Sequence, residues 1–132
     1  MVQMPTNWDQ PNPPKSLSIV YDPKVLYGTV AAAGSVSSAF DLDGWTQFAL
    51  QINPNGGTIL GGTVVNIWAG NSLQDTFSPV YGTTGAVAST LQIGSTGVQF
   101  LSPIPVLTPL RFVKFVLPGT QSAAVNLNLI VK

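Results

Sequence analysis

The fold is decided by the stretch SAAVNLNLIVK, residues 122–132. Its apolar residues alternate with Asn126 and Asn128, so that one face of the segment is apolar and the other is polar. This period of two residues is typical of a β-strand that buries one face. The predicted strand turns four side chains toward a core: Val125, Leu127, Leu129 and Val131.

Similar alternation extends over much of the chain. It is clearest in WTQFALQIN (45–53), TVVNIWAG (63–70) and RFVKFVL (111–117). Weaker patterns occur in VLYGTVAA (25–32), SSAFDL (37–42), TFSPVYG (76–82), STLQI (89–93) and VQFLS (98–102). Gly, Pro, Asn and Asp clusters separate these segments, and such residues favour chain reversal. We therefore expect an all-β fold, a single β-sandwich or jelly roll of about eight short antiparallel strands, over residues 17–132.

Residues 1–16 differ in composition from the rest of the chain. They hold four of the 11 prolines and one aromatic residue, Trp8. Because proline lacks an N–H and fixes φ, we expect an extended arm that joins neither a sheet nor a helix. The arm is either a loose terminus or a contact element that lies on a neighbouring subunit. The candidates for such contacts are Trp8, Pro11, Pro13 and Pro14.

The 132-residue chain fits one domain and is unusually poor in charge. Five Lys or Arg residues balance five Asp residues, and the sequence contains no Glu, His or Cys. It offers no basic stripe for phosphates, no thiolate ligand or nucleophile, and no imidazole base. We therefore expect no enzyme activity, no cofactor or metal, and no nucleic-acid partner. Zero net charge and an amide-rich surface favour self-association, so we expect a homo-oligomer.

A membrane partner is not expected either. Residues 76–110 carry no charge, but prolines and glycines interrupt them, whereas a spanning helix needs about 20 mainly apolar residues in a row. The opening MVQMPTNWDQPNPP has neither a basic nor an apolar region of the kind that secretory signals have. We expect synthesis in the cytoplasm.

Asp41-Leu42-Asp43-Gly44 resembles the opening of a calcium loop. A helix–loop–helix calcium site needs a bidentate Glu at its twelfth position, where this chain has Ile52. We interpret the motif as the end of a strand and the turn before Trp45, with a structural calcium ion as the open alternative.

Aromatic residues provide a second possible function. Trp45, Trp68, Tyr21, Tyr27 and Tyr81 could stack on sugar rings, and Trp45, Trp68 and Tyr81 are the main candidates. Trp68 alternates with the inward-facing residues of its strand, so parity predicts that it is exposed or lies at an interface. Tryptophan is a frequent anchor of subunit contacts, which makes Trp68 an interface candidate as well.

Three motifs resemble virion β-sandwich proteins of tailed bacteriophages, namely capsid cement (decoration) proteins and related head or tail modules. They are FDLDGWTQFALQI (40–52), VVNIWAGNS (64–72) and RFVKFVLPGTQSAAVNLNLIV (111–131). The resemblance covers about residues 40–131. It implies a protein of the capsid exterior that trimerises and locks copies of the major capsid protein together, with residues 1–16 reaching over the capsid or a neighbouring subunit.

The first hypothesis is therefore a structural, non-enzymatic cement protein of the virion. The second is a carbohydrate-binding or tail-associated β-sandwich module. The third is an outer-membrane or secreted structural protein.

Overall fold

The computed structural model describes residues 23–81, 90–104, 107 and 110–132. The predicted arm, with Trp8, Pro11, Pro13 and Pro14, lies outside the described residues, as does Tyr21. The boundary between arm and sandwich therefore stays a prediction. In the described residues no helix has the length and apolarity needed to cross a membrane.

The described residues form nine strands in two antiparallel sheets, which confirms the all-β prediction. Sheet A has the order β1-β9-β3-β7. Sheet B has the order β2-β8-β4-β5, with β6 also paired to β4. The strands are β1 (Lys24–Val30), β2 (Phe40–Asp41), β3 (Phe48–Asn53), β4 (Val64–Gly70), β5 (Ser78–Pro79), β6 (Thr90–Gln92), β7 (Gln99–Leu101), β8 (Phe112–Val116) and β9 (Val125–Val131).

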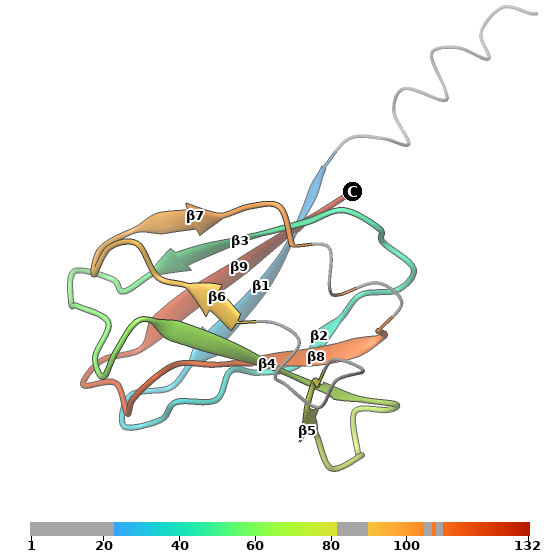
Figure 1. Cartoon of the computed structure of the whole chain (residues 1–132), viewed down its shortest axis with the longest axis horizontal. Coiled ribbons are helices and arrows are strands. Elements are labelled where there is room, and N and C mark those ends of the chain that lie inside the picture. Colours follow the sequence, from blue (N-terminus) through green and yellow to red (C-terminus); the bar gives the residue numbers. More distant parts are fainter. Residues whose placement is uncertain (1–22, 82–89, 105–106, 108–109) are drawn as a thin grey trace, which may run out of the picture.

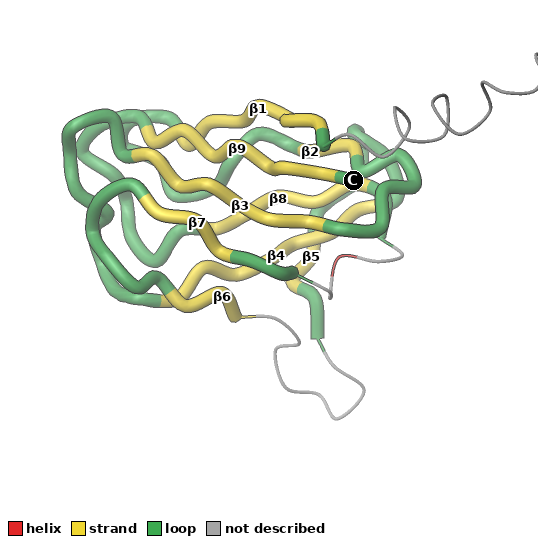
Figure 2. Tube along the Cα trace, turned by 90° about the horizontal axis from the view of Figure 1, so that it is seen from above, coloured by secondary structure: helices red, strands yellow, loops and turns green. Residues whose placement is uncertain are grey.

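The two sheets lie face to face. Figure 1 shows β3, β7 and β9 on one side of the sandwich and β4 and β8 on the other. Figure 2 looks onto sheet A, where β1, β9, β3 and β7 lie side by side in this order. Each of the predicted segments overlaps one of these strands, and β9 lies between β1 and β3.

The core between the sheets is built by the predicted alternation. In β9, Val125, Leu127, Leu129 and Val131 are all buried, and the residues between them are only half-buried. The same pattern holds in β3 and β8. Sheet A adds Leu50 and Ile52 to the core, and sheet B adds Val65, Ile67, Val113 and Phe115.

Gly28 in β1 is required by close packing with Phe40. A Cβ at Gly28 would lie 2.3 Å from the Phe40 ring, far inside van der Waals contact. That ring packs edge-on against Phe115, with 5.5 Å between the ring centroids. A glycine inside a strand commonly marks such an approach.

The loops at one end of the sandwich are tied together by Gln121, which is 1% exposed. The Leu60 N–H donates to Gln121 Oε1 at 2.9 Å, and Gln121 Nε2 donates to the Gly119 carbonyl at 2.7 Å and the Leu60 carbonyl at 3.3 Å. Its backbone N–H donates to the Gly34 carbonyl. Through its side chain and its backbone, Gln121 thus joins its own loop to two others that are far away in the sequence.

Candidate binding faces

The outer face of sheet A carries one continuous row of side chains across all four strands. In register, Tyr27 of β1 pairs with Asn128 of β9, Asn128 with Gln51 of β3, and Gln51 with Phe100 of β7. We call these four residues the sheet A row. Tyr27 is 79% exposed and Phe100 is 64% exposed, so an open aromatic ring lies at each end.

The two amides in the middle of the row are hydrogen-bonded to each other. Asn128 Nδ2 donates to Gln51 Oε1 at 3.0 Å. Within the described residues, no side-chain hydrogen bond engages Gln51 Nε2 or Asn128 Oδ1. The pair therefore presents one free donor group and one free acceptor between the two rings.

The outward side chains of the described strands of sheet A are all uncharged, and Lys132, which directly follows β9, borders the face at one end. The face is rich in polar side chains on one side of the row and apolar on the other. The remaining outward residues are Thr29, Asn53 and Asn126 on one side of the row and Val25, Ala49 and Ile130 on the other.

A hollow of about 430 Å³ indents the apolar end of the face. Ala49 and Ile130, which pair across β3 and β9, lie on its wall, together with Ile104 and Pro103. Pro23, the first described residue, also lines it. Pro23 directly precedes β1, so the beginning of this strand lies next to the hollow.

The outer face of sheet B is organised around Trp68. In register, Trp68 lies between Lys114 of β8 and Pro79 of β5. Its outward direction agrees with the parity prediction, but the side chain is half-buried and not exposed. Its cross-strand neighbours lie close enough to cover part of the ring. Phe112 and Val116 of β8 point the same way and are also half-buried.

Part of this face is covered by the segment that precedes β5. Phe77 is 8% exposed, yet it is not part of the core between the sheets. Its ring lies against Gly70, where a Cβ would come within 3.3 Å of it, and Lys114 Nζ lies 4.4 Å from its centroid. Lys114 is thereby held over an aromatic ring beside Trp68.

The structure does not bring the three predicted sugar-stacking residues onto one platform. Trp45 packs partly against the core, with Lys24 Nζ 5.6 Å from its ring centroid. Trp68 lies on the outer face of sheet B, and Tyr81, which is 58% exposed, follows β5. Trp45 precedes β3 of sheet A, whereas Trp68 belongs to β4 of sheet B, so different elements carry the two rings.

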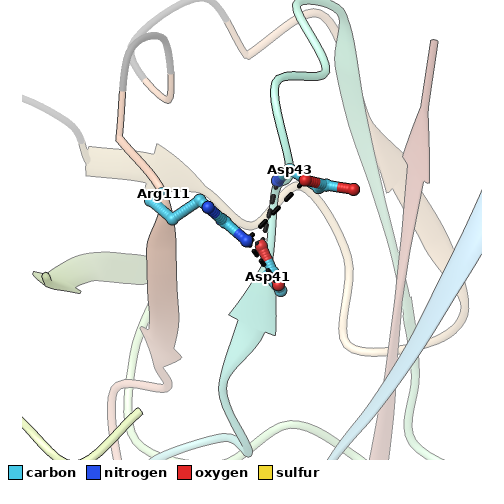
Figure 3. Close-up of polar contacts among 3 residues, drawn as sticks. All are labelled: Asp41, Asp43 and Arg111. Carbon is cyan, nitrogen blue, oxygen red and sulfur yellow. Dashed lines mark hydrogen bonds and ion pairs between the residues drawn. The ribbon is translucent and has the colours of Figure 1, made fainter. Parts of the chain in front are cut away.

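The Asp41–Gly44 motif forms an ion pair and a turn. Arg111 Nε lies 2.6 Å from Asp41 Oδ1, and its terminal nitrogen lies 3.2 Å from Asp41 Oδ2 and 3.7 Å from Asp43 Oδ1 (Figure 3). This hydrogen bonding by the guanidinium lowers the pKa of Asp41. The turn that follows has positive φ at Asp43 and Gly44. Asp41 ends β2 and the turn precedes Trp45, as the sequence predicts.

A guanidinium already occupies the carboxylate that a calcium ion would need. In the described part of the chain no group of three or more His, Cys, Asp or Glu side chains comes together as a metal site would require. The arrangement is that of an exposed ion pair closing the end of a strand.

Sequence reasoning missed the sheet A row as a unit. Tyr27 was among the aromatic candidates, but Phe100 was not. The available signal was alternation: Phe100 lies between two less exposed residues in VQFLS, and Tyr27 between Leu26 and Gly28 in VLYGTVAA.

Comparison of the chain with protein-family models and with curated proteins gives no match to either.

Proposed function

We propose that this protein is a structural component of a virion that binds the outer capsid surface and stabilises the shell. In this proposal its partners are the major capsid protein and further copies of itself, with three subunits favoured by the resemblance to cement proteins. The proposal includes no catalytic role, since the sequence has no His, Cys or Glu to supply the usual acids, bases and nucleophiles.

The observation that carries the proposal is the environment of Trp68 on sheet B. A tryptophan lies at the centre of an outer face, with half-buried Phe112 and Val116 beside it and exposed Val36 paired to Val116 at its margin. Interface hot spots are enriched in Trp and lie near the centre of a contact, surrounded by groups that exclude water. We assign this face to the capsid or subunit contact, and the arm of residues 1–16 to a second contact.

The test first looks for a major capsid protein gene beside this gene and then uses shells assembled from that protein. We expect the intact protein to co-sediment with such shells, and Trp68→Ala to weaken binding by about 2 kcal/mol or more, the size of a hot spot. Tyr27→Ala, an exposed aromatic truncation on the opposite sheet, is the matched control and should bind like the wild type.

Two results would reject the proposal. One is a gene neighbourhood without a major capsid protein. The other is a protein that sediments as a monomer at micromolar concentration and binds no shell. Retained binding by Trp68→Ala would move the contact away from sheet B.

A further inference from the structure

The sheet A row has the composition of a small-molecule platform on the side of the sandwich opposite Trp68. We infer that this row binds a neutral oligosaccharide, with Tyr27 and Phe100 stacking on sugar rings and Gln51 and Asn128 hydrogen-bonding to sugar hydroxyls. This inference is independent of the capsid proposal, because it uses the other sheet.

The two aromatic rings are placed to contact separate sugar units. They lie three strand spacings apart in one register, which corresponds to about 14 Å. Both rings are open to solvent at 79% and 64%, although each would gain from burying its apolar surface. An extended chain of several pyranose rings is long enough to cover both at once.

The amide pair between the rings matches the chemistry of sugar hydroxyls. Each hydroxyl is both a donor and an acceptor. Gln51 Nε2 offers a donor and Asn128 Oδ1 an acceptor, and the 3.0 Å bond between the two side chains fixes them side by side. Two neighbouring hydroxyls on one ring satisfy both atoms, one by accepting and one by donating.

The lack of charge on the face selects the class of ligand. None of the outward residues in the described strands of sheet A is ionised, and Lys132, directly after β9, lines the hollow at the end of the face. An anionic glycan or a phosphate bound on the row itself would therefore lose hydration without gaining an ion pair. A neutral polyhydroxylated ligand avoids that cost.

The size of the face favours a small ligand over a second protein. Four strands of up to seven residues span at most about 19 by 23 Å, a footprint of roughly 440 Å². A stable protein contact buries about 800 Å² of accessible surface on each partner, so it would have to extend from this flat face onto the surrounding loops. An oligosaccharide needs much less area, and the hollow beside Ala49 and Ile130 gives the face additional relief.

The experiment measures binding of the intact protein to an array of neutral gluco-, manno- and galacto-configured oligosaccharides, followed by calorimetry with the best binder. We expect Tyr27→Ala and Phe100→Ala each to weaken binding about tenfold or more, the factor that corresponds to 1.4 kcal/mol. Tyr27→Phe should retain binding, because the stacking ring is preserved. Gln51→Leu should weaken it through loss of the donor.

Controls separate this site from the Trp68 face and from loss of folding. Tyr81→Ala removes a similarly exposed ring outside sheet A, and Trp68→Ala alters the proposed capsid contact. Both should bind sugar like the wild type, and the variants of the exposed rings at Tyr27, Phe100 and Tyr81 should keep the wild-type unfolding temperature. Absence of binding to every array member at millimolar concentration, or binding unaffected by Tyr27→Ala and Phe100→Ala, would overturn the inference. So would a Tyr27→Ala variant that binds no less sugar but dissociates an oligomer.

Discussion

Gln121 is expected to be the most sensitive polar residue of the sandwich. The substitution Gln121→Met keeps an unbranched side chain of similar length but removes every side-chain hydrogen bond. It leaves the Leu60 N–H, the Leu60 carbonyl and the Gly119 carbonyl without their partner in a site where Gln121 is 1% exposed. Each buried polar group left unpaired costs about 1–3 kcal/mol. Leu60 itself is 37% exposed, so water can replace part of the loss.

We therefore expect Gln121→Met to lower the free energy of unfolding by about 2–4 kcal/mol, a large share of the stability of a small domain. Urea unfolding followed by tryptophan fluorescence measures this as a lower midpoint with an unchanged slope. Gln92→Met is the matched control. Gln92 is exposed and its side chain makes one long hydrogen bond to Thr63. The free energy of unfolding of Gln92→Met should therefore stay within about 0.5 kcal/mol of the wild-type value.

Gln121→Glu tests the same site with nearly unchanged shape. The introduced carboxyl would face two carbonyl oxygens, which raises its pKa in the folded state. A raised folded pKa means that this variant is relatively most stable below the unfolded pKa of about 4.3 and loses stability as the pH rises through the folded pKa. A Gln121→Met variant within 1 kcal/mol of the wild type, or a Gln121→Glu variant without this pH dependence, would refute the reasoning.

Three further predictions concern packing, charge and the arm. Gly28→Ala should destabilise the fold by about 1–3 kcal/mol through its clash with Phe40, measured by urea unfolding; a neutral effect would contradict the packing argument. Arg111 lowers the pKa of Asp41, so their ion pair stabilises the fold above about pH 4 and is lost as the pH falls through the lower folded pKa. Asp41→Asn should therefore reduce the thermal midpoint at pH 7 and flatten its decline between pH 4 and 2; an equally steep decline would argue against the pair. Deleting residues 1–16 should leave far-ultraviolet dichroism and the unfolding midpoint unchanged and weaken capsid binding; unchanged binding would make the arm a loose terminus.

The individual strands could be predicted from the sequence, but their neighbours could not. Alternation in the segment 125–131 directly reports which side chains are buried. It contains nothing about the order β1-β9-β3, because pairing between residues far apart in the chain leaves no local pattern. The sheet A row is assembled by that order. Phe100 was therefore missed, since its strand has three residues and its partners come from elsewhere.

The outward direction of Trp68 was predictable from parity, whereas its half-burial was not. The residues that partly bury the Trp68 ring are its cross-strand neighbours in β5 and β8. Trp45, which follows a turn, is predicted as a sugar-stacking candidate, but its ring packs partly against the core. A turn in the backbone does not determine where a large side chain of the following residue lies.

The position of β9 has a consequence for how the protein is made. β1 and β3 do not pair with each other: both pair with β9, the last of the described strands to be synthesised, and β3 pairs on its other side with β7. On the ribosome, β3 and β7 can pair earlier, but β1 cannot join sheet A until residues 125–131 have left the exit tunnel, and until then β1 and β3 hold unpaired edges. Nascent chains interrupted before β9 would keep those edges open to chaperones and proteases. Only a molecule that has been translated through its ninth strand can bring Tyr27 and Phe100 into one row.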